Sequence, residues 1–222
     1  MIAGLSRYKD NIIFYHYMEE IDAILYINLA HRTDRNTHIL SELQKCGIDS
    51  SKIHRIDAVH RTPGALGCGL SHIKALTEAF SHSEWNTVLI LEDDFTFRSD
   101  SEINHKVKQL LTSHLFFDVG LLSYNPDYVK YTDTIVPFIK RIQYSQTASA
   151  YIIRRHYIPT LLQNMKVATY DMERFGKRHE NCIDIHWATL QPHGHWYSIF
   201  PAIGYQCCSY SDIEHRVTSY GC

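Results

Sequence analysis

Residues 87–94 read TVLILEDD, and this stretch decides the fold. Its first part, Thr87–Leu91, is a short and almost entirely apolar run, which is typical of a strand buried on both faces. Three acidic residues, Glu92, Asp93 and Asp94, follow directly. In open α/β sheets, ligands bind in the crevice outside the carboxyl ends of the strands. The stretch therefore predicts a buried strand that ends at a binding site.

Strands and helices are expected to alternate on both sides of this stretch, which predicts an α/β fold with a mostly parallel sheet flanked by helices. The strands expected in the first half are Ala23–Ala30, Lys52–Val59, Thr87–Leu91 and Phe116–Ser123. The helices between them are expected to start at Thr33 or Asp34, after Pro63-Gly64 and at Ile103. The helix after Pro63-Gly64 is expected to pack against the sheet through Leu70, Ile73, Leu76 and Phe80. The second half is less regular, with strands expected at Ile135–Ile142, Ala148–Ile153 and His195–Phe200 and helices at Tyr157–Met165 and Cys182–Leu190.

Charge and composition exclude several classes of protein. Lys and Arg number 22 against 24 Asp and Glu, and no basic run occurs, so nucleic acid is not an expected partner. No window approaches the ~18 apolar residues that a membrane span needs. Charged residues near the start stand where a signal peptide would need its apolar core, so we expect a cytoplasmic protein. The six cysteines form no CxxC pair and are expected to be buried or incidental thiols in a reducing compartment.

The three acids that end the stretch repel one another unless a positive charge compensates them. A hard divalent cation such as Mn²⁺ or Mg²⁺ does so, because it prefers oxygen ligands. The oxygens of Glu92, Asp93 and Asp94 are therefore candidate metal ligands, in preference to the 15 histidines and six cysteines. The alternative interpretation is a solvated acidic turn after a strand.

Two further motifs carry candidate binding residues. GALGCGLSH, residues 64–72, has closely spaced glycines that could bring backbone N–H groups to a diphosphate or a sugar, or could simply allow a tight entry into a helix. NLAHRTDR, residues 28–35, offers arginines for a phosphate and Asn28 and Asp34 for a base or ribose. Alternatively, Asp34 caps a helix and both arginines are solvated. The candidate binding residues of the two motifs are Gly67, Ser71, His72, Asn28, Arg32 and Arg35.

In this order, INLAHRTDR, GALGCGLSH and LILEDD resemble glycosyltransferase family 25. That family holds bacterial lipooligosaccharide galactosyltransferases and procollagen galactosyltransferase-like enzymes. Later segments resemble it too, and the resemblance covers residues 24 to about 216. The chain is also similar to the short, single-domain versions carried by large DNA viruses. These later segments are TASAYII (147–153), CIDIHW (182–187), FPAIGYQ (200–206) and SYSDI (209–213).

The resemblance implies a GT-A-like, Rossmann-like fold that binds a UDP-sugar through Mn²⁺ or Mg²⁺. It places Asp94 as the direct metal ligand and Glu92 at the first acid of the family's Asp-x-Asp motif, with Asp93 between them. Gln206 and Ser211 would contact the donor. The whole chain, 1–222, would be one glycosyltransferase domain. Its parts would be a lead-in (1–21), a nucleotide-binding half (22–124) and an acceptor-side half with irregular structure (125–222).

The family resemblance also implies an inverting displacement, which needs a general base on the acceptor hydroxyl. Asp184 is our candidate, because partial burial in an apolar segment would raise its pKa. The alternative role for Asp184 is capping a helix. Asp212 is the second candidate base. His186 could complete the metal shell from a loop, or could be a satisfied or solvated histidine.

The function expected from these motifs is transfer of galactose or glucose from a UDP-sugar to a hydroxyl of a glycan or glycoprotein. Two alternatives remain. The first is a family member that binds a sugar nucleotide or glycan without turnover. The second is a nucleotidyltransferase, although such an enzyme would want a P-loop, and the sequence has no GxxxxGK[ST] motif.

Overall fold

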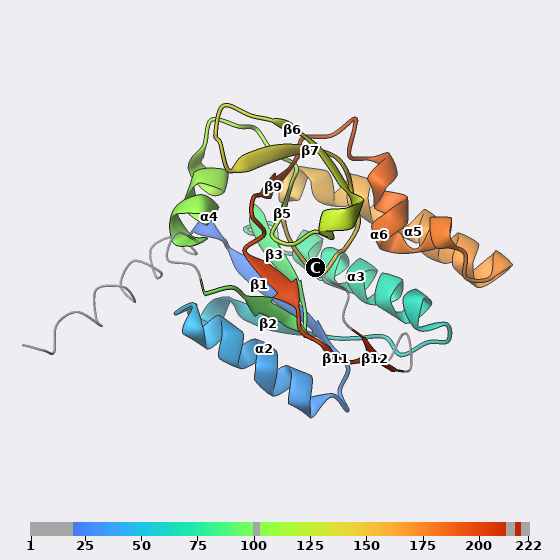
Figure 1. Cartoon of the computed structure of the whole chain (residues 1–222). Coiled ribbons are helices and arrows are strands. Elements are labelled where there is room, and N and C mark those ends of the chain that lie inside the picture. The colour runs from blue at the N-terminus through green and yellow to red at the C-terminus, as the bar shows by residue number, and fades with distance from the viewer. Residues whose placement is uncertain (1–19, 100–102, 212–215, 219–222) are drawn as a thin grey trace, which may run out of the picture.

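The computed structural model describes residues 20–99, 103–211 and 216–218, and its core is an eight-stranded sheet with helices on both faces (Figure 1). The sheet has the order β2-β1-β3-β8-β5-β9-β7-β6. Its strands are β1 (Ala23–Asn28), β2 (Ile53–Asp57), β3 (Thr87–Glu92), β5 (Val119–Leu121), β6 (Val129–Asp133), β7 (Ile139–Ser145), β8 (Ala150–Arg154) and β9 (Trp196–Ile199). Two small sheets pair β4 (Phe95–Phe97) with β10 (Gly204–Gln206) and β11 (Ser209–Ser211) with β12 (Arg216–Thr218).

The helices form the outer layers, because the central strands present apolar side chains to both faces. In β1, Leu25 and Ile27 face the core under one set of helices, whereas Ile24 and Tyr26 face the other. Helices α3, α5 and α6 cover the first face, and α2 and α4 cover the second (Figure 1). The α-helices are α2 (Thr33–Lys45), α3 (Gly64–Ser81), α4 (Ile103–Thr112), α5 (Ile158–Phe175) and α6 (Ile183–His186). Short 3-10 helices lie at Ser50–Lys52, Pro126–Tyr128, Arg155–Tyr157, His179–Asn181 and Trp187–Thr189.

The α/β fold class is confirmed. The sheet is parallel in the first part of the chain, where strands and helices alternate most regularly. β2, β1 and β3 are parallel, with Ile27 of β1 opposite Glu92 of β3. β8 then lies antiparallel between β3 and β5, so the sheet as a whole is mixed. The direction of β8 was not readable from its sequence, because a strand buried on both faces is apolar whichever way it runs.

Several element boundaries differ from those expected. Helix α5 continues to Phe175 and ends at Gly176, whose positive φ of 82° favours glycine. The strand expected from Ile135 begins only at Ile139, and Ile135 is 87% exposed. Phe80 of α3 is exposed, with Arg155 over its ring, instead of packing in the core.

The β4–β10 pair places a late segment of the chain beside the end of β3. β4 follows β3 after a two-residue turn, and Gln206 of β10 pairs with Phe95 of β4. This short antiparallel pair was not expected from the sequence. It carries the Gln206 side chain to the acids that end β3.

Of the expected lead-in, residues 1–19 lie outside the described residues. Within the part of the chain that the structure describes, no helix is both long enough and apolar enough to cross a membrane.

Candidate functional site

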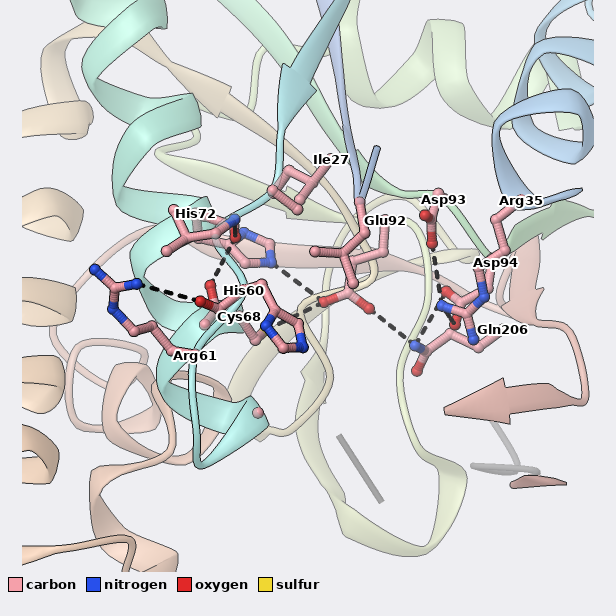
Figure 2. A pocket seen from close by; sticks show the side chains of 16 residues that line it. Ile27, Arg35, His60, Arg61, Cys68, His72, Glu92, Asp93, Asp94 and Gln206 are labelled. Atoms are coloured by element: carbon pink, nitrogen blue, oxygen red, sulfur yellow. Dashed lines mark hydrogen bonds and ion pairs between the residues drawn. The ribbon is translucent and has the colours of Figure 1, made fainter. Parts of the chain in front are cut away.

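The three acids at the end of β3 stand beside a cavity of about 110 Å³, room for several water molecules or a hydrated ion (Figure 2). Glu92 is the last residue of β3, and Asp93 and Asp94 form the turn into β4. The cavity is lined from the end of β1, the start of α2, the segment after β2, helix α3, these acids and β10. Its lining residues are Ile27, Leu29, Arg35, Ala58, Val59, His60, Arg61, Gly64, Gly67, Cys68, Ser71, His72, Glu92, Asp93, Asp94 and Gln206.

Asp93 is held by donors of the protein on both of its carboxylate oxygens. Asn28 Nδ2 donates to Oδ2 at 2.7 Å, and Arg35 Nη1 donates to Oδ1 at 3.1 Å. Burial raises the pKa of Asp93, and the Arg35 charge opposes this rise. Asn28, at the end of β1, thus connects that strand to the acidic turn through Asp93. Its Nδ2 also donates to the carbonyl of Arg32, just before α2. Asn28 and Asp93 therefore form an anchor that fixes the turn.

The negative charge around Asp94 is only partly compensated by positive charge. Its Oδ2 lies 3.2 Å from Arg35 Nη1, and its Oδ1 accepts a 3.3 Å hydrogen bond from Gln206 Nε2. Burial, followed by repulsion from Glu92, raises the pKa of Asp94 to about 7. Arg35 is the cation that touches two of the three acids. A buried group of oxygen ligands with this excess of negative charge fits a hard divalent cation.

Glu92 joins two different environments through its two oxygens. Oε1 accepts from His72 Nε2 at 3.2 Å and from Cys68 Sγ at 3.6 Å, and Oε2 accepts from Gln206 Nε2 at 2.9 Å. Burial raises the pKa of Glu92, but the hydrogen bonds and charge of His72 outweigh it, and the pKa falls below its ordinary value. His72 is fully buried, and its Nδ1 lies 3.1 Å from the hydroxyl of Tyr151.

Arg35, a candidate for binding phosphate, lies against the acids, whereas Arg32 does not. Arg32 binds Asp34 with two hydrogen bonds, from Nε to Oδ1 at 3.0 Å and from Nη2 to Oδ2 at 2.8 Å. These bonds lower the pKa of Asp34 to about 2. Asp34 thus pairs with Arg32 instead of capping α2, and Arg32 is absent from the cavity lining described above.

The glycine-rich stretch lies inside helix α3, where its residues hold the wall of the cavity. Ser71 Oγ donates to the carbonyl of Gly67 at 2.6 Å and accepts from the N–H of Val59 at 2.8 Å. A Cβ on Gly67 would stand 2.4 Å from the Val59 carbonyl oxygen. Gly67 and Ser71 line the cavity, and their contacts fix the segment after β2 against α3.

Replacing Gly67 by Ala should destabilise the protein by roughly 1–3 kcal/mol, the usual cost of overpacking. The added Cβ would meet backbone atoms of Val59 and Arg61, which cannot rotate away as a side chain can. Urea unfolding measures the difference in free energy. Thr77→Ala, at an exposed position of the same helix, should change it by less than about 0.5 kcal/mol. Equal stability of Gly67→Ala and Thr77→Ala would show that the close approach of Gly67 to the Val59 backbone does not contribute to stability.

Asp184 lies in the first turn of α6 and is not among the residues that line the cavity. Its Oδ2 accepts a 3.3 Å hydrogen bond from the N–H of Thr147, a residue held at the unusual φ of 84°. Burial raises the pKa of Asp184, and the charge of Glu92 adds to the rise. A non-glycine residue at positive φ is strained, and such strain gathers at functional sites.

The structure does not bring His186 to the acids. Burial lowers the pKa of His186, and the charge that acts on it is that of Asp171 in α5, on the helical side of the fold. Its Nδ1 is buried with no hydrogen-bond partner among the described residues. Asp212 lies outside the described residues. Ser211 ends strand β11, whose backbone pairs with β12.

Two residues that contact Glu92 or His72 were missed from the sequence, as were His60 and Arg61 of the cavity lining. Cys68 lies four residues before His72 on α3, a spacing that places both side chains on one face of a helix. This spacing was a readable signal. Tyr151, which fixes the His72 ring, follows the segment that carries Thr147, and nothing local indicated that it would face His72.

One solved structure with a TM-score of 0.50 supports the same fold class, and two others are similar to the chain at lower TM-scores. A UDP-glucose pyrophosphorylase complexed with UDP-glucose has a TM-score of 0.50 at 10% identity, covering 89% of this chain and 80% of that one. A197 from STIV has a TM-score of 0.49 at 13% identity, covering 90% and 94%. A glycosyltransferase involved in glycosylation of the major capsid of PBCV-1 has a TM-score of 0.49 at 11% identity, covering 87% and 95%.

At 10% identity the likeness to the pyrophosphorylase concerns the fold alone, which is GT-A-like. No curated protein matches the chain. The sequence itself matches glycosyltransferase family 25, described as an LPS biosynthesis protein, over residues 51–176. The matched region is more than half of the 222 residues and contains α3, the acidic turn and the segment of Thr147. The chain therefore belongs to glycosyltransferase family 25.

Proposed function

We propose that the protein transfers a hexose, galactose or glucose, from a UDP-sugar to a hydroxyl group of a glycan or glycoprotein, with inversion and with a divalent metal. The observation that carries the proposal is the acidic turn after β3. There, Glu92 and Asp94 face the cavity together with Arg35, at the sheet edge where ligands of such folds bind. Membership of a glycosyltransferase family supplies the reaction class.

Asp94 and Glu92 are the residues that would hold Mn²⁺ or Mg²⁺, because Asp93 already accepts from Asn28 at 2.7 Å and from Arg35 at 3.1 Å, shorter contacts than the 3.2 and 3.3 Å contacts of Asp94. The fit rests on the buried negative charge, which Arg35 compensates only in part and which raises the pKa of Asp94. When bound, the metal ion would neutralise the charge that develops on the departing diphosphate. Arg35 would orient the acids and add positive charge on the same side.

Asp184 is the residue that we assign as general base. Its Oδ oxygens would accept the proton of the acceptor hydroxyl as the hydroxyl oxygen forms its bond to the anomeric carbon of the hexose. The bond from that carbon to the diphosphate breaks on the opposite side, and UDP leaves with the electron pair. The raised pKa of Asp184 brings its basicity nearer to neutral pH, which favours this role.

Thermal unfolding with UDP and Mn²⁺ tests the donor site. UDP at about 100 times its Kd stabilises a protein by ~2.7 kcal/mol, which corresponds to a rise in Tm of roughly 5–10 °C for a chain of this size. We expect this rise only when UDP and Mn²⁺ are both present. As a control, Asp127→Asn changes an exposed acid outside the acidic turn and should show the same rise in Tm as wild type. A shift of the same size with UDP alone would argue against the metal.

A further inference from the structure

We propose that Cys68, His72 and Glu92 form a second cation site, one that takes a zinc-class divalent ion and is distinct from the oxygen site at Asp94. The Sγ, imidazole nitrogen and carboxylate oxygen that the three residues offer lie within 4.8 Å of one another. All three residues line the cavity (Figure 2). The site does not depend on the transferase reaction, because it rests on the ligand set alone.

Two of the three spacings between the ligand atoms match those of tetrahedral coordination, and the third, between Cys68 and His72, lies within 4.8 Å. Cys68 Sγ lies 3.6 Å from Glu92 Oε1, and His72 Nε2 lies 3.2 Å from the same oxygen. Zinc bond lengths of about 2.0–2.3 Å at tetrahedral angles place such sulfur–oxygen and nitrogen–oxygen pairs ~3.6 and ~3.4 Å apart. An ion could therefore enter between the three groups with only small movements of their side chains.

The ligands are carried by rigid elements. Cys68 and His72 stand one turn apart on α3, so a single helical face presents both, and Glu92 is fixed at the end of β3. Tyr151 lies against the ring of His72, with its hydroxyl 3.1 Å from Nδ1. If Nδ1 carries the proton and donates it to this hydroxyl, the lone pair of Nε2 points to the cation. Metal-bound histidines commonly have such an outer partner.

The charges of the ligands also balance. A Cys68 thiolate and a Glu92 carboxylate supply two negative charges, which balance Zn²⁺, and His72 stays neutral. Such a balance suits a site in which His72 is buried and the other two ligands are half-buried. Binding releases the thiol proton to solvent. Three protein ligands leave a fourth position, and because the cluster lines the cavity, that position would face it and hold a water molecule or an oxygen of a ligand.

The two sites would select their ions by ligand chemistry. Thiolate and imidazole favour zinc, whereas the carboxylates of the Asp94 site favour Mn²⁺ or Mg²⁺. Glu92 would contribute to both, Oε1 on the Cys68 side and Oε2 on the side of Gln206. An ion at the first site would therefore fix the carboxylate plane that the second site uses.

Titration of the full-length metal-free protein with Co²⁺ tests the site, because cobalt replaces zinc and a thiolate bound to it gives a near-ultraviolet charge-transfer band. We expect the band at one equivalent and its loss when Zn²⁺ is added. Cys68→Ser should abolish the band, whereas Cys182→Ser, at another half-buried cysteine, should retain it. Tyr151→Phe should keep the band with roughly 10–100-fold weaker affinity.

Asp94→Asn should also keep the cobalt band, which separates this site from the donor site. Absence of the band in wild-type protein would overturn the proposal without affecting the transferase assignment. Persistence of the band in Cys68→Ser, or its loss in a Cys207→Ser/Cys208→Ser double variant, would assign the thiolate elsewhere and would equally overturn it. The wild-type titration keeps the test decisive even if one variant folds poorly.

Discussion

Asp94→Asn should lower metal-dependent UDP release by roughly 10²–10³-fold, the usual loss when one strong electrostatic contact to developing charge is removed. The contacts of Asp94 with Arg35 and Gln206, at 3.2 and 3.3 Å, are longer than those of Asp93, at 2.7 and 3.1 Å, so a cation would compete with weaker donors at Asp94. Initial rates of UDP release with saturating Mn²⁺ measure the effect. The isosteric amide keeps the volume of the site and removes only its charge.

The same substitution should make the metal-free protein more stable. The pKa of Asp94 is raised to about 7 by burial and by Glu92, so its ionised form costs stability once the pH exceeds the ordinary value near 3.9. The metal-free wild type should therefore lose stability as the pH rises from about 4 to about 7, and the variant should lose less. Urea unfolding at pH 5 and pH 8 measures this. A variant that is less stable at pH 8 would contradict the charge excess, and Asp127→Asn serves as the exposed control for both measurements.

Asp184→Asn should lower the rate of hexose transfer by roughly 10²–10⁴-fold, the contribution expected from a general base, with the affinity for UDP unchanged. The amide can still accept the hydrogen bond from the N–H of Thr147, so the local structure is retained while the basic group is lost. Transfer to an acceptor measures the rate, and the thermal shift with UDP and Mn²⁺ measures donor binding.

Asp171→Asn is the matched control for this prediction, because Asp171 is a half-buried acid on the neighbouring helix α5 and faces His186. It should transfer hexose at the wild-type rate. Undiminished turnover in Asp184→Asn would remove Asp184 as the base. Equal losses in both variants would indicate a structural effect of the helical layer.

The part of the site that could be predicted lies where the signal is local. The apolar run before Glu92 correctly predicted the central strand β3, and the acids after it line a cavity at the end of that strand. Arg35 and Asn28 follow the adjacent strand β1, and parallel strands bring their carboxyl ends to one edge. The parallel pairing of β1 and β3 therefore explains why Asn28 and Arg35 lie beside the acids that follow β3.

The remainder depends on long-range geometry. Arg32 and Arg35 are both in the motif after β1, yet only the structure shows that Arg32 turns to Asp34. Gln206 reaches the acids because β10 pairs with β4, two short strands with little sequence signal. His186 was a candidate metal ligand, with a satisfied or solvated histidine as the alternative, and it does not line the cavity beside the acids.

The glycine motif shows a different kind of limit. Closely spaced glycines indicate that something comes near the backbone, without identifying it. At Gly67 the close neighbour is the chain itself, at Val59, and at Gly69 it is the side chains of Thr169 and Ile183. The sequence therefore predicted close approach correctly, and the structure identifies the neighbours as protein packing.

UDP release by the wild-type protein, measured across a panel of UDP-sugars with Mn²⁺ and again with EDTA, tests the central claim most directly. We expect release from UDP-galactose or UDP-glucose, supported by Mn²⁺ and stopped by EDTA. A protein that binds UDP with Mn²⁺ but releases none would be a binding member of the family. Release at the same rate in EDTA would contradict the metal-dependent site at Glu92 and Asp94.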